Sequence, residues 1–308
     1  MLMETNVSDI ATLLEVRRSS SSRTVLFLGA RAGGLFYNTT FHECVEKFSK
    51  RLFSQLSETA KFHECYKILS DTGRFSENDV YDILALSLKN LQYRREDDCL
   101  VELIKEDFFD IVISTSVDDL LDNAFDREEM RSQYDFDIWL PERNRVEDIM
   151  YHKTKYCMML KVFGDLGSRQ YKVINNEFDL DNDPTLKAFL EKAFSRHVLM
   201  IGYDPVWDRT IERAFSTRGD DIWFVNEDKP PEASWITHVM EKRKGKYFTG
   251  NLGNYRRFTM ALHSQLLNRN PLRYEAIRQM STQLQEIQEG IQSLQADVAK
   301  LLEAKEVI

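Results

Sequence analysis

The stretch Thr24-Val-Leu-Phe-Leu-Gly-Ala-Arg-Ala-Gly-Gly-Leu-Phe36 decides the fold, because an apolar run ends abruptly in a glycine-rich turn. The residues from Val25 to Leu28 do not alternate between apolar and polar. This pattern is typical of a central strand that is covered on both faces of its sheet. A helix is expected to follow from Thr39 to Ser49. The sequence therefore predicts a strand, a glycine turn and a helix in succession.

The glycine turn is a candidate phosphate site. Gly29, Gly33 and Gly34 permit close approach of another backbone and positive φ angles. A turn of this kind, followed by a helix, presents free backbone N–H groups to an anion. However, Arg31 stands where the G-x-G-x-x-G fingerprint has its second glycine, so a plain tight turn is an alternative interpretation.

Composition limits the protein class. The chain has 308 residues, of which 43% are hydrophobic, and 41 basic against 50 acidic residues give a net charge of −9. This balance argues against a general nucleic-acid-binding role. The four cysteines lie far apart without a C-x-x-C pair, so neither a disulfide framework nor a metal site is expected. No long apolar run is present, and we expect a cytoplasmic protein without a membrane segment.

The sequence Phe-His-Glu-Cys occurs twice, at 41–44 and 62–65. Histidine and cysteine are metal ligands, and the repetition invites that interpretation. Residues two apart on a helix do not share a face, so we disfavour a metal site in these segments.

Four further apolar runs each end in polar residues. A strand is expected at 111–113, and further strands in the stretches 156–166, 197–208 and 221–226, with helices between them. This alternation predicts a doubly wound parallel sheet, an α/β fold with Rossmann-like order. Ligands of such sheets bind beyond the carboxyl ends of the strands, here residues 29–34, 114–118, 163–168 and 202–208. The expected helices of 41–107 exceed what a crossover needs and form an insertion, either a lid or a partner surface.

Four of these segments, in this order, resemble the sirtuin-like domain superfamily, specifically its bacterial branch in anti-phage defence proteins. They are Gly29-Ala-Arg-Ala-Gly33, Ser114-Thr-Ser-Val-Asp-Asp-Leu-Leu121, Lys161-Val-Phe-Gly-Asp-Leu166 and Gly202-Tyr-Asp-Pro-Val-Trp-Asp208. Family members usually show Gly-Ala-Gly-x-Ser, Thr-Thr-Asn-Tyr-Asp-Asp-Leu-Leu, Lys-Leu-His-Gly-Asp-Leu and Gly-Tyr-Ser-x-x-Asp at these places. The match spans roughly residues 24–228.

The resemblance implies that the crevice binds NAD, as substrate or ligand, and that no metal is needed. The residues that it places around NAD are Gly29, Ala30, Arg31, Gly33, Thr115, Gly164, Gly202, Tyr203 and Asp208. On the same basis, a defence effector would hydrolyse NAD to nicotinamide and ADP-ribose on activation or assembly, together with a sensor protein from the same defence system.

The departures from the family fall on its catalytic positions. The motif asparagine corresponds to Ser116, and the general-base histidine corresponds to Phe163, which cannot accept a proton. Cleavage of the nicotinamide–ribose bond passes through an oxocarbenium-like state that a carboxylate stabilises. We therefore assign Asp118, Ser116 and Asp165 as the candidate catalytic residues. The alternatives are that these residues only cap turns and helices, and that the chain is a catalytically inactive scaffold or nucleotide-binding regulator.

The C-terminal region is of a different kind. Residues 1–23 are expected as a leader helix and loop, 24–230 as the α/β domain, and 231–308 as a helical tail. Within the tail, apolar residues alternate spacings of three and four at Ile277, Met280, Leu284, Ile287, Ile291, Leu294, Val298 and Leu301. This is a heptad seam, and it predicts a coiled coil over 277–301 through which copies of the chain associate. The alternative is a helix that packs back on its own chain.

Overall fold

The computed structural model describes residues 2–18, 23–71, 73–89, 91, 93–141, 155–172 and 179–268, together with Met280, Ile287, Gly290 and Ile291. The chain separates into two compact units, Met1–Leu266 and Leu267–Ile308. The predicted coiled coil lies in the second unit, and most of residues 277–301 fall outside the described residues. All the elements described below lie in the first unit, except that the last helix, α10 (Tyr255–Leu267), ends one residue beyond it.

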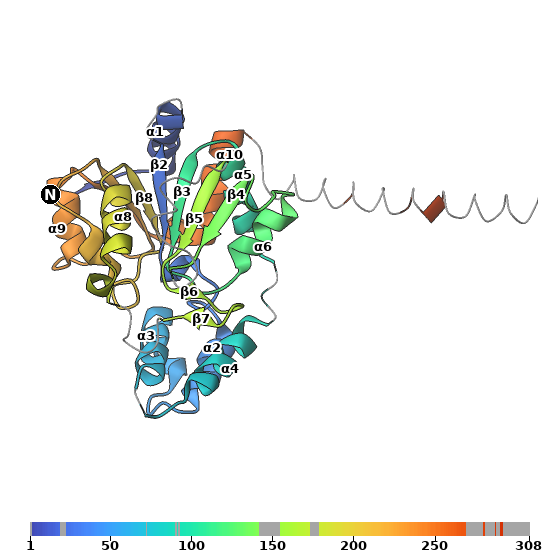
Figure 1. Cartoon of the computed structure of the whole chain (residues 1–308). Helices are drawn as coiled ribbons and strands as arrows, with labels where there is room; N and C mark the ends of the chain where they lie inside the picture. Colours follow the sequence, from blue (N-terminus) through green and yellow to red (C-terminus); the bar gives the residue numbers. More distant parts are fainter. Residues whose placement is uncertain are drawn as a thin grey trace, which may run out of the picture. The chain divides into compact units, whose positions relative to one another are not determined.

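A parallel sheet of eight strands forms the centre of the first unit (Figure 1), and every pair of neighbouring strands in it is parallel. This architecture confirms the expected doubly wound α/β fold. In spatial order the strands are β1 (Met3–Glu4), β10 (Lys246–Phe248), β9 (Ile222–Val225), β8 (Val198–Ile201), β2 (Thr24–Leu28), β3 (Phe109–Ser114), β5 (Cys157–Lys161) and β4 (Phe136–Trp139).

The strand β2 lies at the topological switch point. After β2 the chain adds strands on one side, through β3 to β4 and β5, and it then adds β8, β9 and β10 on the other side. Leu28 pairs with Ser114 of β3 and with Ile201 of β8, so the three strands end at the same level. The segments that begin at Gly29, Thr115 and Gly202 consequently meet at one edge of the sheet.

Every residue of β2 is buried, which explains its apolar sequence without alternation. The helices that cover the sheet are α1 (Val7–Arg18), α5 (Arg95–Lys105), α6 (Leu120–Arg127), α8 (Pro184–Phe194), α9 (Trp235–Lys242) and α10 (Tyr255–Leu267). In Figure 1, α8 and α9 lie toward one side of the sheet, and α5, α6 and α10 toward the other. No helix among the described residues is long and apolar enough to cross a lipid bilayer.

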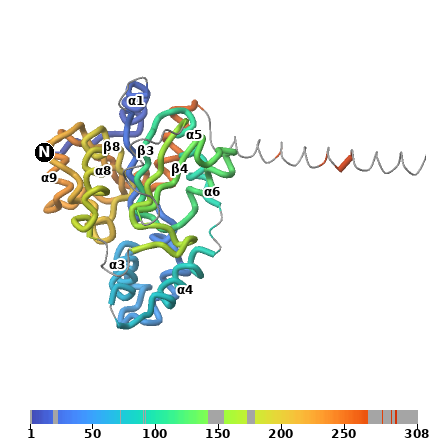
Figure 2. The backbone as a smooth tube through the Cα atoms, viewed as in Figure 1, coloured from blue at the N-terminus to red at the C-terminus, as the bar shows by residue number. Residues whose placement is uncertain are grey.

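The helical insertion forms a separate layer at the carboxyl ends of the strands, which Figure 2 shows as the blue-to-cyan part of the tube. It contains α2 (Thr39–Glu46), the 3₁₀ turn η2 (Phe53–Gln55), α3 (Glu58–Leu69) and α4 (Glu77–Leu88). Ser76 and Asp79 form a reciprocal capping box at the start of α4. The small hairpin of β6 (Gly164–Asp165) and β7 (Gln170–Tyr171) lies nearby.

The sheet extends beyond the boundaries expected at residues 23 and 230. The strand β1 pairs with β10, and β10 pairs with β9, so both ends of the first unit contribute to one sheet. These strands have only two and three residues, too few to show an apolar pattern in the sequence. The segment after β8 contains the 3₁₀ turn η4 (Ile211–Ala214).

Candidate functional site

The glycine turn after β2 folds as the 3₁₀ turn η1 (Ala30–Ala32), flanked by Gly29 and Gly33. Its backbone N–H groups already have partners within the chain. The N–H of Ala30 donates to Asp208 Oδ2 at 3.2 Å, and that of Gly34 donates to Asp118 Oδ2 at 2.7 Å. The three N–H groups between them donate to the carbonyl oxygens of Gly202, Gly29 and Ala30. Two carboxylates of the protein thus occupy donors that a phosphate would otherwise use.

The glycines of the turn are required by close packing, and the expectation of positive φ angles is wrong for Gly29 and Gly33. Gly29 has φ −81° and Gly33 has φ −76°, which other residues also adopt. A Cβ atom on Gly29 would lie 2.5 Å from Asp208 Oδ2 and 2.6 Å from the Gly202 carbonyl oxygen. A Cβ on Gly33 would lie 2.4 Å from Ser116 Oγ. The groups that lie so close to these two glycines belong to the protein itself.

Asp208 lies at the switch point without exposed surface. Its carboxyl group accepts hydrogen bonds from the Ala30 and Asp204 N–H groups and, at 2.6 Å, from the Thr115 hydroxyl. Burial raises the pKa of Asp208 to about 8, against the opposite effect of these hydrogen bonds. The predicted site residues Gly29, Ala30, Thr115, Gly202 and Asp208 are therefore together, in a closed cluster that holds β2, β3 and β8 in place.

Asp118 and Ser116 form a second cluster at the other end of the turn. The Ser116 hydroxyl donates to Asp118 Oδ2, and the Leu120 N–H donates to Asp118 Oδ1 at 3.2 Å. With the bond from Gly34, the carboxylate of Asp118 accepts three hydrogen bonds and is 6% exposed. Asp118 therefore links the glycine turn to the first turn of α6.

Asp165 is held by a buried lysine. Lys161 Nζ has no exposed surface and donates to Asp165 Oδ1 at 2.6 Å, to Asp122 Oδ2 at 2.9 Å and to the Asp118 carbonyl oxygen at 2.8 Å. Burial alone would raise the pKa of Asp165, but the charge and hydrogen bond of Lys161 hold it below its ordinary value. Asp165 also accepts the Ser168 N–H, so both of its oxygens are occupied.

Two other predicted residues lie apart from these clusters. Gly164 has φ +82°, and a Cβ there would lie 1.9 Å from the Gln170 carbonyl oxygen, so this glycine is needed for the β6–β7 hairpin. The side chain of Tyr203 is buried and its hydroxyl donates to Glu212. In this structure both residues support the local fold.

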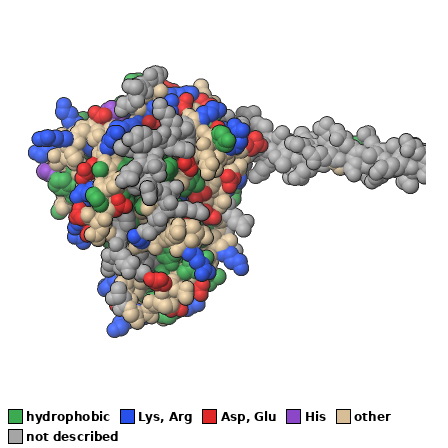
Figure 3. Space-filling model, viewed as in Figure 1, with side chains coloured by type: hydrophobic (Ala, Val, Ile, Leu, Met, Phe, Trp, Pro, Cys, Tyr) green, Lys and Arg blue, Asp and Glu red, His purple; other side chains and the backbone are tan. Residues whose placement is uncertain are grey.

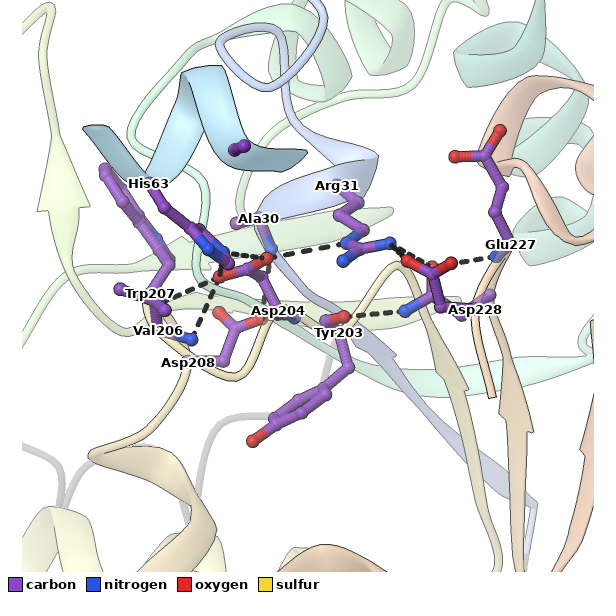
Figure 4. A network of polar contacts seen from close by, with 12 residues as sticks. Ala30, Arg31, His63, Tyr203, Asp204, Val206, Trp207, Asp208, Glu227 and Asp228 are labelled. Atoms are coloured by element: carbon purple, nitrogen blue, oxygen red, sulfur yellow. Dashed lines mark hydrogen bonds and ion pairs between the residues drawn. The ribbon is translucent and has the colours of Figure 1, made fainter. Parts of the chain in front are cut away.

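Arg31, His63 and Asp204 form a polar network that the sequence did not indicate (Figure 4). His63 Nε2 lies 3.0 and 2.9 Å from the two carboxylate oxygens of Asp204, and Arg31 Nε lies 3.5 Å from Oδ2. Asp204 is fully buried and also accepts the Val206 and Trp207 N–H groups. Burial opposes ionisation, yet the hydrogen bond and charge of His63 hold the pKa of Asp204 below its ordinary value.

Phe163, which the sequence resemblance aligned with a histidine, is a core residue. It is 3% exposed, and its ring packs edge-to-face against Trp207 at 6.3 Å between centroids. The Trp207 ring also contacts Phe62 and Tyr66 of α3, and its Nε1–H donates to the Thr115 carbonyl oxygen. Phe163 thus belongs to an aromatic cluster between the sheet and the insertion.

A pocket of about 480 Å³, which we call the turn pocket, lies beside the glycine turn. It is formed between the turn and the beginnings of α2, α5 and α10, and its lining includes Arg31, Gly33, Thr39, Arg94, Asn254 and Arg256. A second pocket of about 620 Å³ borders Asp118, and a space of about 20 Å³ borders Ser116 and Asp118. Of the predicted residues, Arg31 and Gly33 line the turn pocket.

Among the described residues, no group of three or more His, Cys, Asp or Glu side chains is arranged to hold a metal ion. On the face that Figure 3 shows, acidic and basic side chains are interspersed.

Neither a model of a known protein family nor a curated protein matches this chain. Among solved structures, it is similar to a chain described under "Structural Basis for the Mechanism and Regulation of Sir2 Enzymes", with 11% identity and a TM-score of 0.39 over 85% of this chain and 99% of that chain. A chain of the ADAL–IMP complex has 10% identity and a TM-score of 0.21 over 83% of this chain and 89% of that chain. At TM-scores below 0.5 these similarities carry no argument, so the α/β fold rests on the strand order of the chain itself.

Proposed function

We propose that this chain is a sirtuin-like, nucleotide-binding subunit that takes NAD or a related adenine nucleotide in the turn pocket and does not hydrolyse it in the conformation described here. The observation that carries the proposal is the position of the turn pocket, next to the glycine turn and the switch point, where open α/β sheets bind ligands. The four motifs in family order support the sirtuin-like assignment.

The state of the three candidate catalytic residues supports binding without turnover. Asp118 accepts three hydrogen bonds, Asp165 is paired with Lys161, and Ser116 donates to Asp118. A carboxylate in this state is not available to activate water. Phe163 supplies no base, because its ring lies in the core.

The experiment that tests this function measures NAD binding by calorimetric titration and NAD loss by nicotinamide release, on the same purified protein. Saturable binding of NAD without nicotinamide release is the expected result. Absence of binding by NAD and by ADP-ribose would refute the nucleotide-binding role. The variant Thr40→Trp places a bulky ring at the wall of the turn pocket and should abolish binding, and its circular dichroism serves as the folding control.

A second candidate is the NAD glycohydrolase of an anti-phage effector that becomes active on assembly or on a signal from a partner sensor. It is favoured by the position of Asp118, which borders the 620 Å³ pocket and lies directly behind the glycine turn. Release of Asp118 from Gly34 would expose a carboxylate to a bound dinucleotide. Nicotinamide release in the presence of the products of neighbouring genes, abolished by Asp118→Asn, would establish this function in place of the first.

Self-association through the C-terminal heptads completes the proposal. The described seam residues Met280, Ile287 and Ile291 are helical and 50–62% exposed. An apolar stripe of this length is stabilised by a second copy of the same helix. Ile287→Asp combined with Ile291→Asp should lower the mass found by sedimentation equilibrium, whereas Gln292→Asp, off the seam, should not. Equal masses for all three proteins would contradict the coiled coil.

A further inference from the structure

Arg31 is buried at the border of the turn pocket, yet part of its hydrogen-bonding capacity is unused. Its side chain is 5% exposed, and Nη1 donates to Asp228 Oδ2 at 2.6 Å and to Asn226 Oδ1 at 3.3 Å. The buried Nε has no hydrogen-bond partner. Nη2 has none either among the residues that the structure describes, and in Figure 4 no contact is drawn to it. A buried guanidinium group normally uses its N–H groups, so this one has capacity for a further acceptor.

The two carboxylates next to Arg31 differ in how firmly they are held. Asp204 is fully buried and fixed by His63 and by two backbone N–H groups. The side chain of Asp228 is 66% exposed, and Arg31 is its one hydrogen-bond partner in the described part of the chain. The Asp228 side of this ion pair lies in solvent, so water can solvate its carboxylate when Asp228 leaves Arg31. Asp204 keeps the arginine in place when that happens.

We propose that Arg31 is the phosphate-binding residue of the turn pocket, and that a phosphate or pyrophosphate group of the ligand replaces Asp228 on Nη1 and engages the unused Nη2. The planar fork of a guanidinium group fits two phosphate oxygens at once, which a single carboxylate oxygen of Asp228 does not use. The arginine thereby supplies what the backbone of the turn does not offer, because Asp118 and Asp208 hold its terminal N–H groups.

The rest of the turn pocket is compatible with such a ligand. Thr39 and Thr40 at the start of α2, and Asn254 at the start of α10, add polar groups around its wall. The volume of about 480 Å³ is in the range of nucleotide-sized ligands. Arg94 is already bidentate to Asp97. Arg256 is 65% exposed, with its Nε 3.9 Å from Glu96 Oε2, so Arg31 is the buried arginine of this wall that has a replaceable partner.

Asp228→Asn tests this inference, because it removes the resident charge from an exposed side chain and leaves the fold intact. Calorimetry with pyrophosphate, ADP-ribose and phosphate-free adenosine compares it with wild type. We expect the two phosphate compounds to bind the variant roughly fivefold more tightly, with adenosine unchanged. Asp82→Asn is the matched control, since Asp82 is an exposed carboxylate on α4 outside the turn pocket. Arg31→Lys, which keeps the charge but loses the fork, should weaken pyrophosphate binding at least tenfold.

The outcomes separate this inference from the proposed function, on whose pocket it rests. NAD binding that is identical in wild type, Asp228→Asn and Arg31→Lys would overturn the role of Arg31 and leave nucleotide binding in place. Pyrophosphate binding with the expected variant effects, but without NAD binding, would refute the nucleotide and retain the phosphate site. Equal tightening by Asp82→Asn, or no pyrophosphate binding by any variant, would overturn the inference.

Discussion

The two carboxylates that hold the glycine turn do so from opposite ends and in different surroundings. Asp208 holds the Ala30 end in a place without solvent, where burial raises its pKa to about 8. Asp118 holds the Gly34 end, beside two pockets. None of the identified pockets borders the carboxylate at the first end, whereas Asp118 at the second end lines two of them. The identified pockets therefore border Arg31 and the Gly33–Gly34 end of the turn, and none of them borders Gly29 or Ala30.

Alanine at each end of the turn should give the largest contrast. In Gly29→Ala the new Cβ would lie 2.6 Å from the backbone of Gly202 and of Tyr203, which cannot move aside. In Gly34→Ala its nearest neighbour, at 2.7 Å, is the end of the Leu120 side chain. We expect a loss of about 3 kcal/mol or more in the free energy of unfolding for the first and about 1 kcal/mol for the second. Urea denaturation measures both, and equal losses would contradict the comparison.

Removal of each carboxylate tests the same contrast at the side chain. Asp208→Ala leaves the buried N–H groups of Ala30 and Asp204 without acceptors, while the Thr115 hydroxyl keeps the Leu28 carbonyl oxygen, and it should cost about 3 kcal/mol. Asp118→Ala opens onto pockets from which water can replace the lost bonds, and should cost about 1–2 kcal/mol. Thermal unfolding of both proteins checks the order, which is contradicted if Asp118→Ala is the less stable.

The raised pKa of Asp208 predicts a pH dependence that Asp208→Asn removes. The unfolded chain releases this proton near its ordinary pKa of 3.8, whereas the folded chain keeps it up to about pH 8. The folded state therefore loses stability as the pH rises through this window, by about 1 kcal/mol for each pH unit. The stability of wild type minus that of Asp208→Asn should fall between pH 5 and pH 8. Because both proteins share all other titrating groups, a constant difference would show that Asp208 is ionised in the fold.

The smallest contrast concerns the two hydroxyl groups. The Thr115 hydroxyl is buried and donates to Asp208, and the Ser116 hydroxyl donates to Asp118 nearer the surface. Thr115→Val should cost about 1 kcal/mol and Ser116→Ala about 0.5 kcal/mol. Chemical denaturation resolves this difference when both variants are measured with wild type in parallel. A larger loss for Ser116→Ala would show that the Asp118 end is the more rigid one.

The central strands could be predicted because burial on both faces leaves a readable apolar run, as in Val25 to Leu28 and Val198 to Ile201. Their common end, with Gly29, Thr115 and Gly202 together, followed from the topology. The strand β4, with Asp137 inside it, and the short edge strands did not show such a run. Short strands depend on their neighbours in space, which a local pattern does not contain.

The position of the candidate site could be predicted from the sequence, but the hydrogen-bond partners of its groups could not. The sequence offered the N–H groups of the turn to a phosphate, whereas their partners Asp118 and Asp208 are supplied from 84 and 178 residues further along the chain. The contact of His63 with Asp204 spans 141 residues and was missed for the same reason. His63 belongs to the second Phe-His-Glu-Cys segment. That segment was considered as a metal site, and its histidine was not considered as a partner for a carboxylate.

The packing of Trp207 gives the protein an intrinsic optical reporter. Its indole ring contacts Phe62 and Tyr66 of the insertion, while its Nε1–H is bonded to the sheet at Thr115, and it is 5% exposed. Separation of the insertion from the sheet would bring water to the ring and shift its fluorescence to longer wavelengths. A variant that keeps Trp207 as its sole tryptophan would convert every movement between these two layers into a spectral change, without an added dye.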